Sequence, residues 1–332
     1  KTISFIEQLV LIILVYVVIS FFIALPFYLS NYQVTFLNSL FEAISGTTGT
    51  GFSIFKNIKY LDPTLILWRS SSQWIGGLYF LFFLIIIFSN KQFNFKMIYL
   101  TYSGDGRINS ESNIKDILTK IFILYSILTL VIFLLLNISE IRMFNSLNLS
   151  MSLISTGGFI PTNSLNNIIQ SNAQKLVFIF SLLISMLNFF LLLNIFEKKI
   201  IIREHKEDFY LIILSIIFVL LIYLNNYSGL NIIISVISSL GNSGLSLINS
   251  DNNLSLYFIL LTLIGGSLIS NTLGIKFTRI YVLLKTSSSE MIKLISPNSV
   301  INKNIFGSEK KITDDNIKVS FLIFISFFIS LF

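Results

Sequence analysis

The sequence predicts an all-α polytopic membrane protein built from repeated units, each consisting of a helix, a short helix that ends in a loop, and a second helix. Of its 332 residues, 54% are hydrophobic and 12% are charged, and the mean hydropathy is +0.82. Soluble domains carry roughly a quarter charged residues, so this composition indicates a lipid environment. Long apolar runs alternate with shorter segments rich in Gly, Ser and Thr, and this order recurs along the chain.

Six apolar runs are long enough to span a bilayer, which requires ~20 largely apolar residues, and a seventh begins near the end of the chain. They are Phe5–Leu25, Leu65–Phe88, Ile117–Leu136, Leu176–Phe196, Phe209–Leu224, Leu254–Leu284 and Val319–Phe332. Between alternate pairs lie three segments that are too short to span and are typical of re-entrant helices. These short segments are Val34–Phe55, Met143–Thr162 and Ile232–Asn249.

Each short segment ends in a tip of small and hydroxyl residues. The tips align as Gly46–Phe52, Ile154–Phe159 and Gly241–Leu245, with Gly51, Gly157 and Gly244 as the matching glycines. Three tips in matching positions predict an internal repeat. The predicted units are repeat 1 (1–90), a cytoplasmic linker (91–115), repeat 2 (116–197), a second linker (198–208), repeat 3 with a broken second helix (209–285), a third linker (286–316) and the first helix of a fourth repeat (317–332).

The basic residues predict the orientation in the membrane. If the three tips face outside, 18 of the 23 Lys and Arg fall in the inner segments and four in the outer segments, as the positive-inside rule requires. The net charge of +7 is then explained by topology, and no nucleic-acid partner is expected.

The tips have the composition of a cation filter. Converging backbone carbonyls can replace the hydration shell of a cation, and glycine allows the irregular backbone that this requires. The short helix before each tip would direct the negative end of its dipole toward the pore. Surface loops rich in Gly and Ser are the alternative. The predicted filter comprises Gly49, Thr50, Gly51, Ser155, Thr156, Gly157, Asn242, Ser243 and Gly244.

The sixth apolar run contains an interruption. As one helix, the 32 residues from Leu254 to Lys285 would be ~48 Å long, against a hydrocarbon core of ~30 Å. Two glycines fall near its middle and polar residues follow, so we expect an intramembrane gating loop; a helix bent at the two glycines is the alternative. The predicted loop residues are Gly265, Gly266, Ser267, Ser270, Asn271, Thr272 and Gly274.

Further polar residues require an explanation in a membrane. Arg69 is expected to extend its charge to the interface, with support of the filter as the alternative. Glu42 is a candidate to accept hydrogen bonds from the backbone beside the first tip. Asn188 and Asn194 are expected to form helix–helix hydrogen bonds, and Glu197–Asp208 is expected to be a solvated turn.

A series of motifs occurs in one order along the chain: Ala24–Phe27, Leu40–Phe52, Trp68-Arg69 with Gln73–Gly77, Ser155–Phe159, Leu263–Gly266, Gly274–Lys276 and Arg279–Lys285. Together they resemble the superfamily of Trk, Ktr and HKT cation transporters, and most of all the bacterial TrkH-like membrane subunits for potassium uptake. The family is richer in small residues where Leu268, Ile269 and Leu273 stand.

The resemblance implies potassium transport through four repeats around one pore, in a multi-pass protein of the bacterial inner membrane. It also implies a homodimer in contact with lipid and a cytoplasmic regulatory ring that binds a nucleotide (NAD or ATP); no cofactor is expected on this chain. In the family, a glycine at the position of Gly51 favours potassium and a serine is associated with sodium. The repeat spacing places the fourth tip ~20–35 residues beyond Phe332, so we expect the chain to be incomplete at both ends.

The composition also limits the alternatives. The absence of Cys and the single His exclude thiolate chemistry and His-based metal clusters. A polytopic membrane enzyme would need polar catalytic residues on long outer loops, whereas the outer loops here are short, so no enzyme is expected. A sodium-selective or poorly selective transporter on the same fold and a non-conducting fragment remain as alternatives, as do a channel and a coupled symporter.

Overall fold

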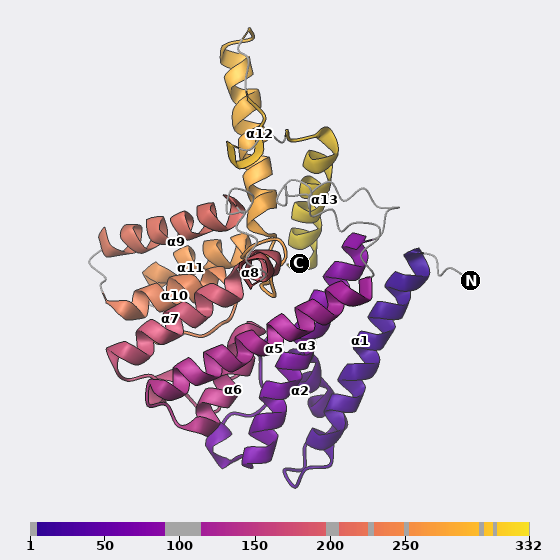
Figure 1. Cartoon of the computed structure of the whole chain (residues 1–332), viewed down its shortest axis with the longest axis vertical. Helices are drawn as coiled ribbons and strands as arrows, with labels where there is room; N and C mark the ends of the chain where they lie inside the picture. The colour runs from indigo at the N-terminus through magenta and orange to yellow at the C-terminus, as the bar shows by residue number, and fades with distance from the viewer. Residues whose placement is uncertain are drawn as a thin grey trace.

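The computed structural model describes residues 5–89, 114–196, 206–224, 229–248, 252–298, 302–307 and 311–331. These ranges are dominated by α-helices, as predicted (Figure 1). The helices are α1 (Phe5–Tyr28), α2 (Phe36–Thr48), α3 (Pro63–Ser89), α5 (Ile114–Ile138), α6 (Met143–Ile154), α7 (Asn172–Met186), α8 (Phe189–Phe196), α9 (Lys206–Leu224), α10 (Leu230–Leu240), α11 (Asn252–Ile264), α12 (Phe277–Ile295) and α13 (Asp314–Leu331).

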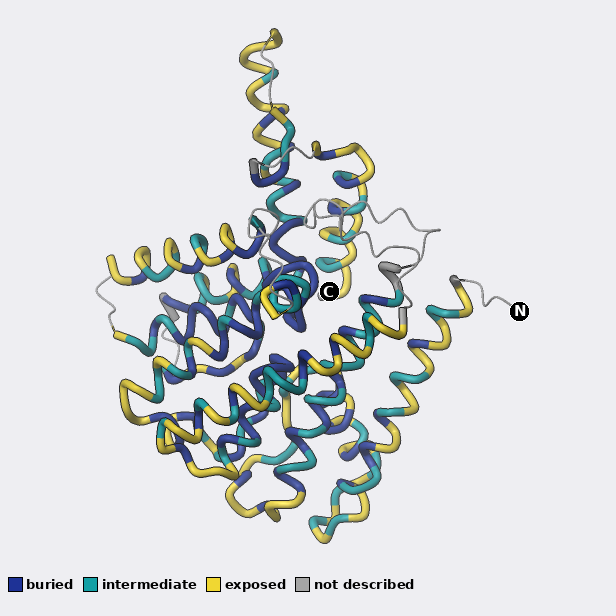
Figure 2. The backbone as a smooth tube through the Cα atoms, in the orientation of Figure 1, coloured by how far each residue is buried: buried dark blue, intermediate teal, exposed yellow. Residues whose placement is uncertain are grey.

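The three short helices pack in the same way within the chain. Helix α2 packs against α1 and α3, α6 against α5 and α7, and α10 against α9 and α11. Neighbouring units are joined because α3 also packs against α6, and α7 against α10. The buried residues gather toward the middle of the molecule, while many residues of α1 and α9 are exposed (Figure 2).

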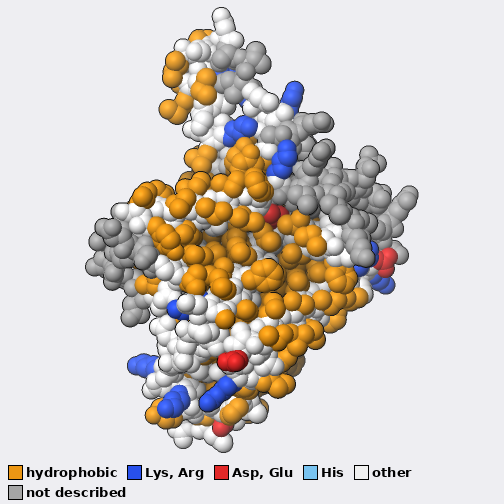
Figure 3. All heavy atoms as spheres, turned by 60° about the vertical axis from the view of Figure 1, so that its left-hand side comes forward, with side chains coloured by type: hydrophobic (Ala, Val, Ile, Leu, Met, Phe, Trp, Pro, Cys, Tyr) orange, Lys and Arg blue, Asp and Glu red, His pale blue; other side chains and the backbone are white. Residues whose placement is uncertain are grey.

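The exposed surface is largely apolar. Three described helices are long and apolar enough to cross a membrane, namely Ile6–Tyr28, Lys115–Ile138 and Lys206–Leu224. On the face shown in Figure 3, hydrophobic side chains form a broad band across the middle, and blue Lys and Arg side chains gather toward the two ends. This distribution is that of a protein surrounded by lipid, with basic residues near the membrane–water interfaces.

Two helices differ from the predicted runs. The run Leu176–Phe196 is broken into α7 and α8, which meet at 104° and together account for a fourth candidate span. Helix α12 continues to Ile295, past the predicted end at Leu284, and projects from the body of the molecule (Figure 1). Hydropathy marks where lipid contact ends rather than where hydrogen bonding ends, because polar residues also continue a helix in water.

Candidate functional site

The three short helices end with the same backbone geometry. In each tip, one residue just after the helix has a positive φ: Gly49 (68°), Thr156 (53°) and Asn242 (52°). The N–H of this residue donates to the carbonyl three residues earlier, and the next N–H donates to the carbonyl five residues earlier, at 2.9–3.2 Å. This is the Schellman arrangement of helix ends. The carbonyls five residues earlier belong to Ser45, Ser152 and Ser238, so the repeat holds in both sequence and geometry.

A second residue with positive φ follows two positions later in each tip. These residues are Gly51 (78°), Gly158 (83°) and Gly244 (65°). The structural counterpart of Gly51 in the second tip is therefore Gly158, one position after the Gly157 that the sequence alignment matched. The alignment was misled because it matched glycine to glycine, whereas the preceding left-handed position is occupied by Thr156, a β-branched residue for which positive φ is rare.

The tips meet backbone to backbone. A Cβ atom built on Gly51 would lie 2.6 Å from the Gly157 carbonyl oxygen, and one on Gly158 would lie 2.7 Å from the Ser243 carbonyl oxygen. The first tip is thus adjacent to the second, and the second to the third, with no room for side chains between them. Glycine is required at Gly51 and Gly158 for this close approach as well as for the positive φ.

An ion pair braces the first tip. Arg69 on α3 donates from Nε to Oε1 of Glu42 on α2 at 2.7 Å, and both side chains are almost completely buried. Glu42 also accepts from the Ser53 hydroxyl and the Ile54 N–H, each at 2.9 Å. The expected interfacial position of Arg69 was wrong: its guanidinium lies 4.2 Å from the ring centroid of Phe159 in the second tip. The expected hydrogen bond to Glu42 from the backbone beside the tip is present, and the Ile54 N–H donates it.

A glutamine on α3, which the sequence analysis did not single out as a site residue, supports the second tip. Gln73 donates from Nε2 to the Gly157 carbonyl and accepts at Oε1 from the Phe159 N–H at 3.2 Å. The side chain is fully buried. One lone pair of the Gly157 carbonyl is therefore occupied by protein. A polar residue four positions after Arg69, on the same face of the helix, was the available signal.

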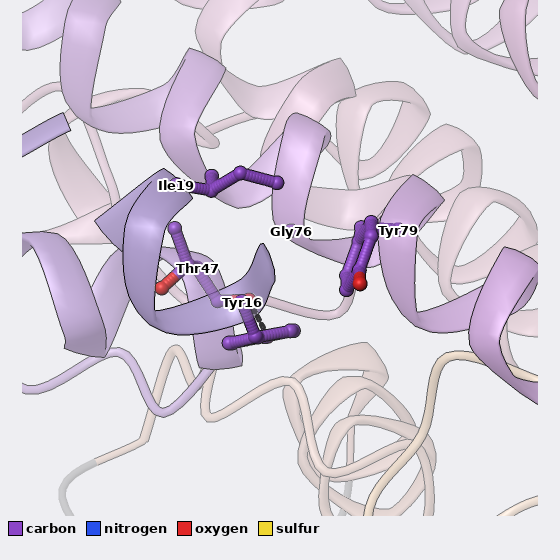
Figure 4. Close-up of a pocket in the computed structure, with 5 residues that line it drawn as sticks. All are labelled: Tyr16, Ile19, Thr47, Gly76 and Tyr79. Carbon is purple, nitrogen blue, oxygen red and sulfur yellow. Dashed lines mark hydrogen bonds between the residues drawn. The ribbon is translucent and has the colours of Figure 1, made fainter. Parts of the chain in front are cut away.

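The back of the first tip rests on α1 and α3. Figure 4 shows a small pocket that is lined by Tyr16 and Ile19 of α1, by Thr47 at the end of α2, and by Gly76 and Tyr79 of α3. The Tyr16 hydroxyl donates to the Thr47 carbonyl. A Cβ on Gly76 would lie 2.0 Å from that carbonyl oxygen, so Gly76 allows α3 to pack directly against the end of α2.

The predicted gating segment is non-helical. Helix α11 ends at Ile264 and α12 begins at Phe277, so the interval between them forms a break loop (265–276). Its polar side chains Ser267, Ser270, Asn271 and Thr272 are all buried.

Two asparagines connect the break loop to the tips. The Asn271 side chain donates from Nδ2 to the Ile154 carbonyl at 2.9 Å. The backbone carbonyl of Asn271 accepts from the Thr156 hydroxyl at 3.2 Å. Asn242 of the third tip donates to the Leu273 carbonyl at 3.1 Å. The structure therefore brings predicted filter and loop residues into direct contact.

The bend between α7 and α8 lies against the break loop. The Phe189 N–H donates to the Ile269 carbonyl at 2.8 Å, and the Ser267 N–H donates to the Met186 carbonyl at 3.3 Å. Asn188 accepts at Oδ1 from the Phe190 N–H at 2.9 Å and so caps the start of α8. The helix–helix hydrogen bond expected for Asn188 was wrong, because the helix is interrupted at this residue; Asn194 is buried on α8.

Two acidic residues at the start of α9 accept hydrogen bonds from the break loop and from the bend between α7 and α8. Glu207 accepts at Oε1 from the Leu268 N–H and at Oε2 from the Ser267 hydroxyl, each at 3.1 Å, and also from the Thr278 hydroxyl on α12. Asp208 accepts from the Asn188 N–H at 3.0 Å. Both are buried, so the solvated turn expected for Glu197–Asp208 was wrong for these two residues; residues 197–205 lie outside the described part of the chain.

Comparison with known proteins gives the family. The model of the TrkH family, described as cation transport protein, matches residues 3–211. An uncharacterized cation transporter of Methanocaldococcus jannaschii, MJ1485, is 29% identical over 297 residues, covering 87% of this chain and 60% of that protein. The potassium uptake protein TrkG of Escherichia coli is 24% identical over 330 residues, covering 93% of this chain and 67% of that protein.

The fold is also that of a solved structure. The crystal structure of the potassium transporter TrkH from Vibrio parahaemolyticus matches with a TM-score of 0.79 at 18% identity, covering 98% of this chain and 70% of that one. This chain spans less than two thirds of the length of the Methanocaldococcus relative. Its repeated helix ends, interrupted helices and apolar surface agree with the family match, and the chain belongs to the TrkH family of cation transport proteins, which are membrane transporters rather than enzymes.

Proposed function

We propose that this chain contributes three of the four repeats of a potassium-uptake pore in the plasma membrane. One observation carries the proposal: three helices end in the same left-handed tips, and these tips meet through their backbones. Such tips present carbonyls to a dehydrated cation without a charged side chain, which is the chemistry of potassium filters. Two relatives from Escherichia coli named as potassium uptake proteins, TrkG and TrkH, support potassium as the ion.

The contacts between segments suggest a role for each segment in the proposed pore. In the proposal, residues 49–51, 155–157 and 242–244 line the filter, and the break loop is the gate beneath it. The units 1–90, 116–197 and 209–285 are the three pore repeats, and 317–332 is the first helix of the fourth. The whole protein forms a homodimer and binds a cytoplasmic ring that carries a nucleotide. The break loop is hydrogen-bonded to the α7–α8 bend and to the start of α9. A movement of α7 or α9 would therefore shift the break loop, which favours this loop as the gate.

The substitution Gly51→Ser tests the selectivity of the proposed filter. The new Cβ would lie 2.6 Å from the Gly157 oxygen in a residue whose φ is 78°, so the first and second tips must separate. We expect the whole protein carrying this change to accept sodium alongside ⁸⁶Rb⁺ in uptake assays. The matched control is Gly229→Ser, where φ is 108° and no described atom lies within 4 Å.

The outcome separates the candidate functions. Potassium selectivity that is lost in Gly51→Ser and kept in Gly229→Ser supports the filter. An unchanged ion preference in a folded Gly51→Ser protein would identify the alternative, a sodium-transporting or poorly selective member of the family.

A further inference from the structure

The break loop contains a buried ammonium group that the filter does not use. Lys276, the last residue of the loop, folds its side chain back over the preceding residues and is only 6% exposed. Its Nζ donates to the Ser270 carbonyl at 3.2 Å, the Ser270 hydroxyl at 3.3 Å and the Thr272 hydroxyl at 3.0 Å, and also to the Thr272 carbonyl.

These four acceptors form an unusual environment for a lysine. A buried ammonium is ordinarily paired with a carboxylate, because an uncompensated charge in a low-dielectric environment is costly. Here the Glu207 carboxylate acts on the ammonium only through its electric field, and the hydrogen-bond acceptors are two carbonyls and two hydroxyls, all of them neutral. Neutral oxygens that replace a hydration shell are the ligands of a dehydrated monovalent cation, and a lysine ammonium is a compact point charge of that kind.

The backbone is strained to keep the ammonium in this position. Lys276 has a φ of 80°, a conformation that is unfavourable for a residue with a Cβ and persists where the surroundings impose it. Nothing in a simple connection between two helices requires a lysine here. A charged residue within a membrane protein is an indication of function.

The residues next to the four oxygens contact the proposed filter. Asn271, between Ser270 and Thr272, is hydrogen-bonded to the backbone of the second pore helix, and Leu273 accepts from Asn242 of the third tip. Glu207, which holds Ser267 and Leu268 at the start of the loop, is close enough to the ammonium to interact with it electrostatically. A cation that leaves the tips toward the break loop therefore reaches the Lys276 cluster.

We propose that the carbonyl and hydroxyl oxygens of Ser270 and Thr272 form a monovalent-cation site, which the Lys276 ammonium fills in this conformation and a potassium ion fills when the loop opens. This inference rests on the proposed pore function and adds a site to it. Lys276 acts as a tethered substitute for the permeating ion: while it is bound, the charge and volume of its ammonium exclude a second cation. When the loop opens, a potassium ion replaces the ammonium at the same four oxygens. Each oxygen therefore still contacts a cation.

The test replaces the ammonium in the whole protein with two neutral side chains. Lys276→Met removes all donors, and Lys276→Gln retains an amide that can still donate to loop oxygens. If Lys276 is a tethered cation, both variants vacate the site and raise ⁸⁶Rb⁺ flux in proteoliposomes about tenfold, the factor that one hydrogen bond to a charged group contributes. If Lys276 is only a hydrogen-bonding clip, Lys276→Gln behaves like the wild type, and that result would overturn the inference.

A binding measurement checks the same point without transport. The unfolding temperature is followed as KCl replaces choline chloride, because a ligand that binds only the folded state raises it. Both variants should show a greater K⁺-dependent rise than the wild type, and adding Ser270→Ala should remove the excess. An equal rise in wild type and folded variants contradicts the site. The two proposals fail separately: loss of selectivity in Gly51→Ser with no effect at Lys276 would retain the filter and reject only this site.

Discussion

The buried pair between Glu42 and Arg69 offers a sharp test of how the first tip is held. In Glu42→Gln the shape is kept and the charge is lost. Oε1 accepts from Arg69 and Ser53, and Oε2 accepts from the Ile54 N–H. Whichever way the amide is placed, its NH₂ group faces one of these donors, and Arg69 is left buried without a counter-charge.

The expected loss is large. Breaking a buried pair by removing one partner costs about 3–5 kcal/mol, compared with changes within about 0.5 kcal/mol for an ordinary surface substitution. We therefore expect Glu42→Gln to lower the unfolding temperature of the detergent-solubilised protein and to weaken the preference for ⁸⁶Rb⁺ over Na⁺, because Ser53 and Ile54 directly follow the first tip. Glu140→Gln, which changes an exposed acid on an outer loop, is the matched control.

A double-mutant cycle identifies the mechanism. Combining Glu42→Gln with Arg69→Met removes both charges, so the double variant should lose less stability than the sum of the single losses, by about 0.5–3 kcal/mol for residues in contact. Strict additivity, or a Glu42→Gln protein with the stability and selectivity of the control, would refute the assignment of this pair as the brace of the first tip.

Three further predictions concern contacts around the tips and the break loop. Gly76→Ala places a Cβ 2.0 Å from the Thr47 carbonyl oxygen, so we expect the unfolding temperature to fall; an unchanged unfolding temperature would contradict this close contact. Glu207→Gln weakens the hold on the break loop, and we expect ⁸⁶Rb⁺ flux to rise without a change in selectivity; unchanged flux would exclude Glu207 from gating. Asn271→Leu removes the 2.9 Å bond to the Ile154 carbonyl and should raise flux about as much as one lost hydrogen bond allows, ~5- to 10-fold.

Local features were predictable from the sequence. Small residues after a short apolar segment indicated the tips, and two glycines in an overlong apolar run indicated the break before Phe277, because both depend on residues close together in the chain. The bend at Asn188 was not predicted, because Leu176–Phe196 reads as one apolar run. The hydrogen bonds that stabilise the bend come from Asp208 and Ile269, which are distant in the sequence.

Partners distant in sequence were not predictable. Nothing in the sequence pairs Arg69 with Glu42, or Gln73 with the second tip, because these contacts depend on the packing of α3 against α2 and α6. The charged segment Glu197–Asp208 appeared suited to solvent, yet Glu207 and Asp208 are buried, because hydrogen-bond donors at the α7–α8 bend and in the break loop converge on them. The offset between Gly157 and Gly158 could be resolved only by backbone dihedral angles.

The central claim is that the three tips hold a dehydrated cation, and anomalous diffraction from crystals of the whole protein grown in RbCl tests it most directly. We expect anomalous density between the backbones of residues 49–51, 155–157 and 242–244, and weaker density there in Gly51→Ser crystals. Crystals of a transport-active protein with Rb⁺ density elsewhere and none between these tips would contradict it.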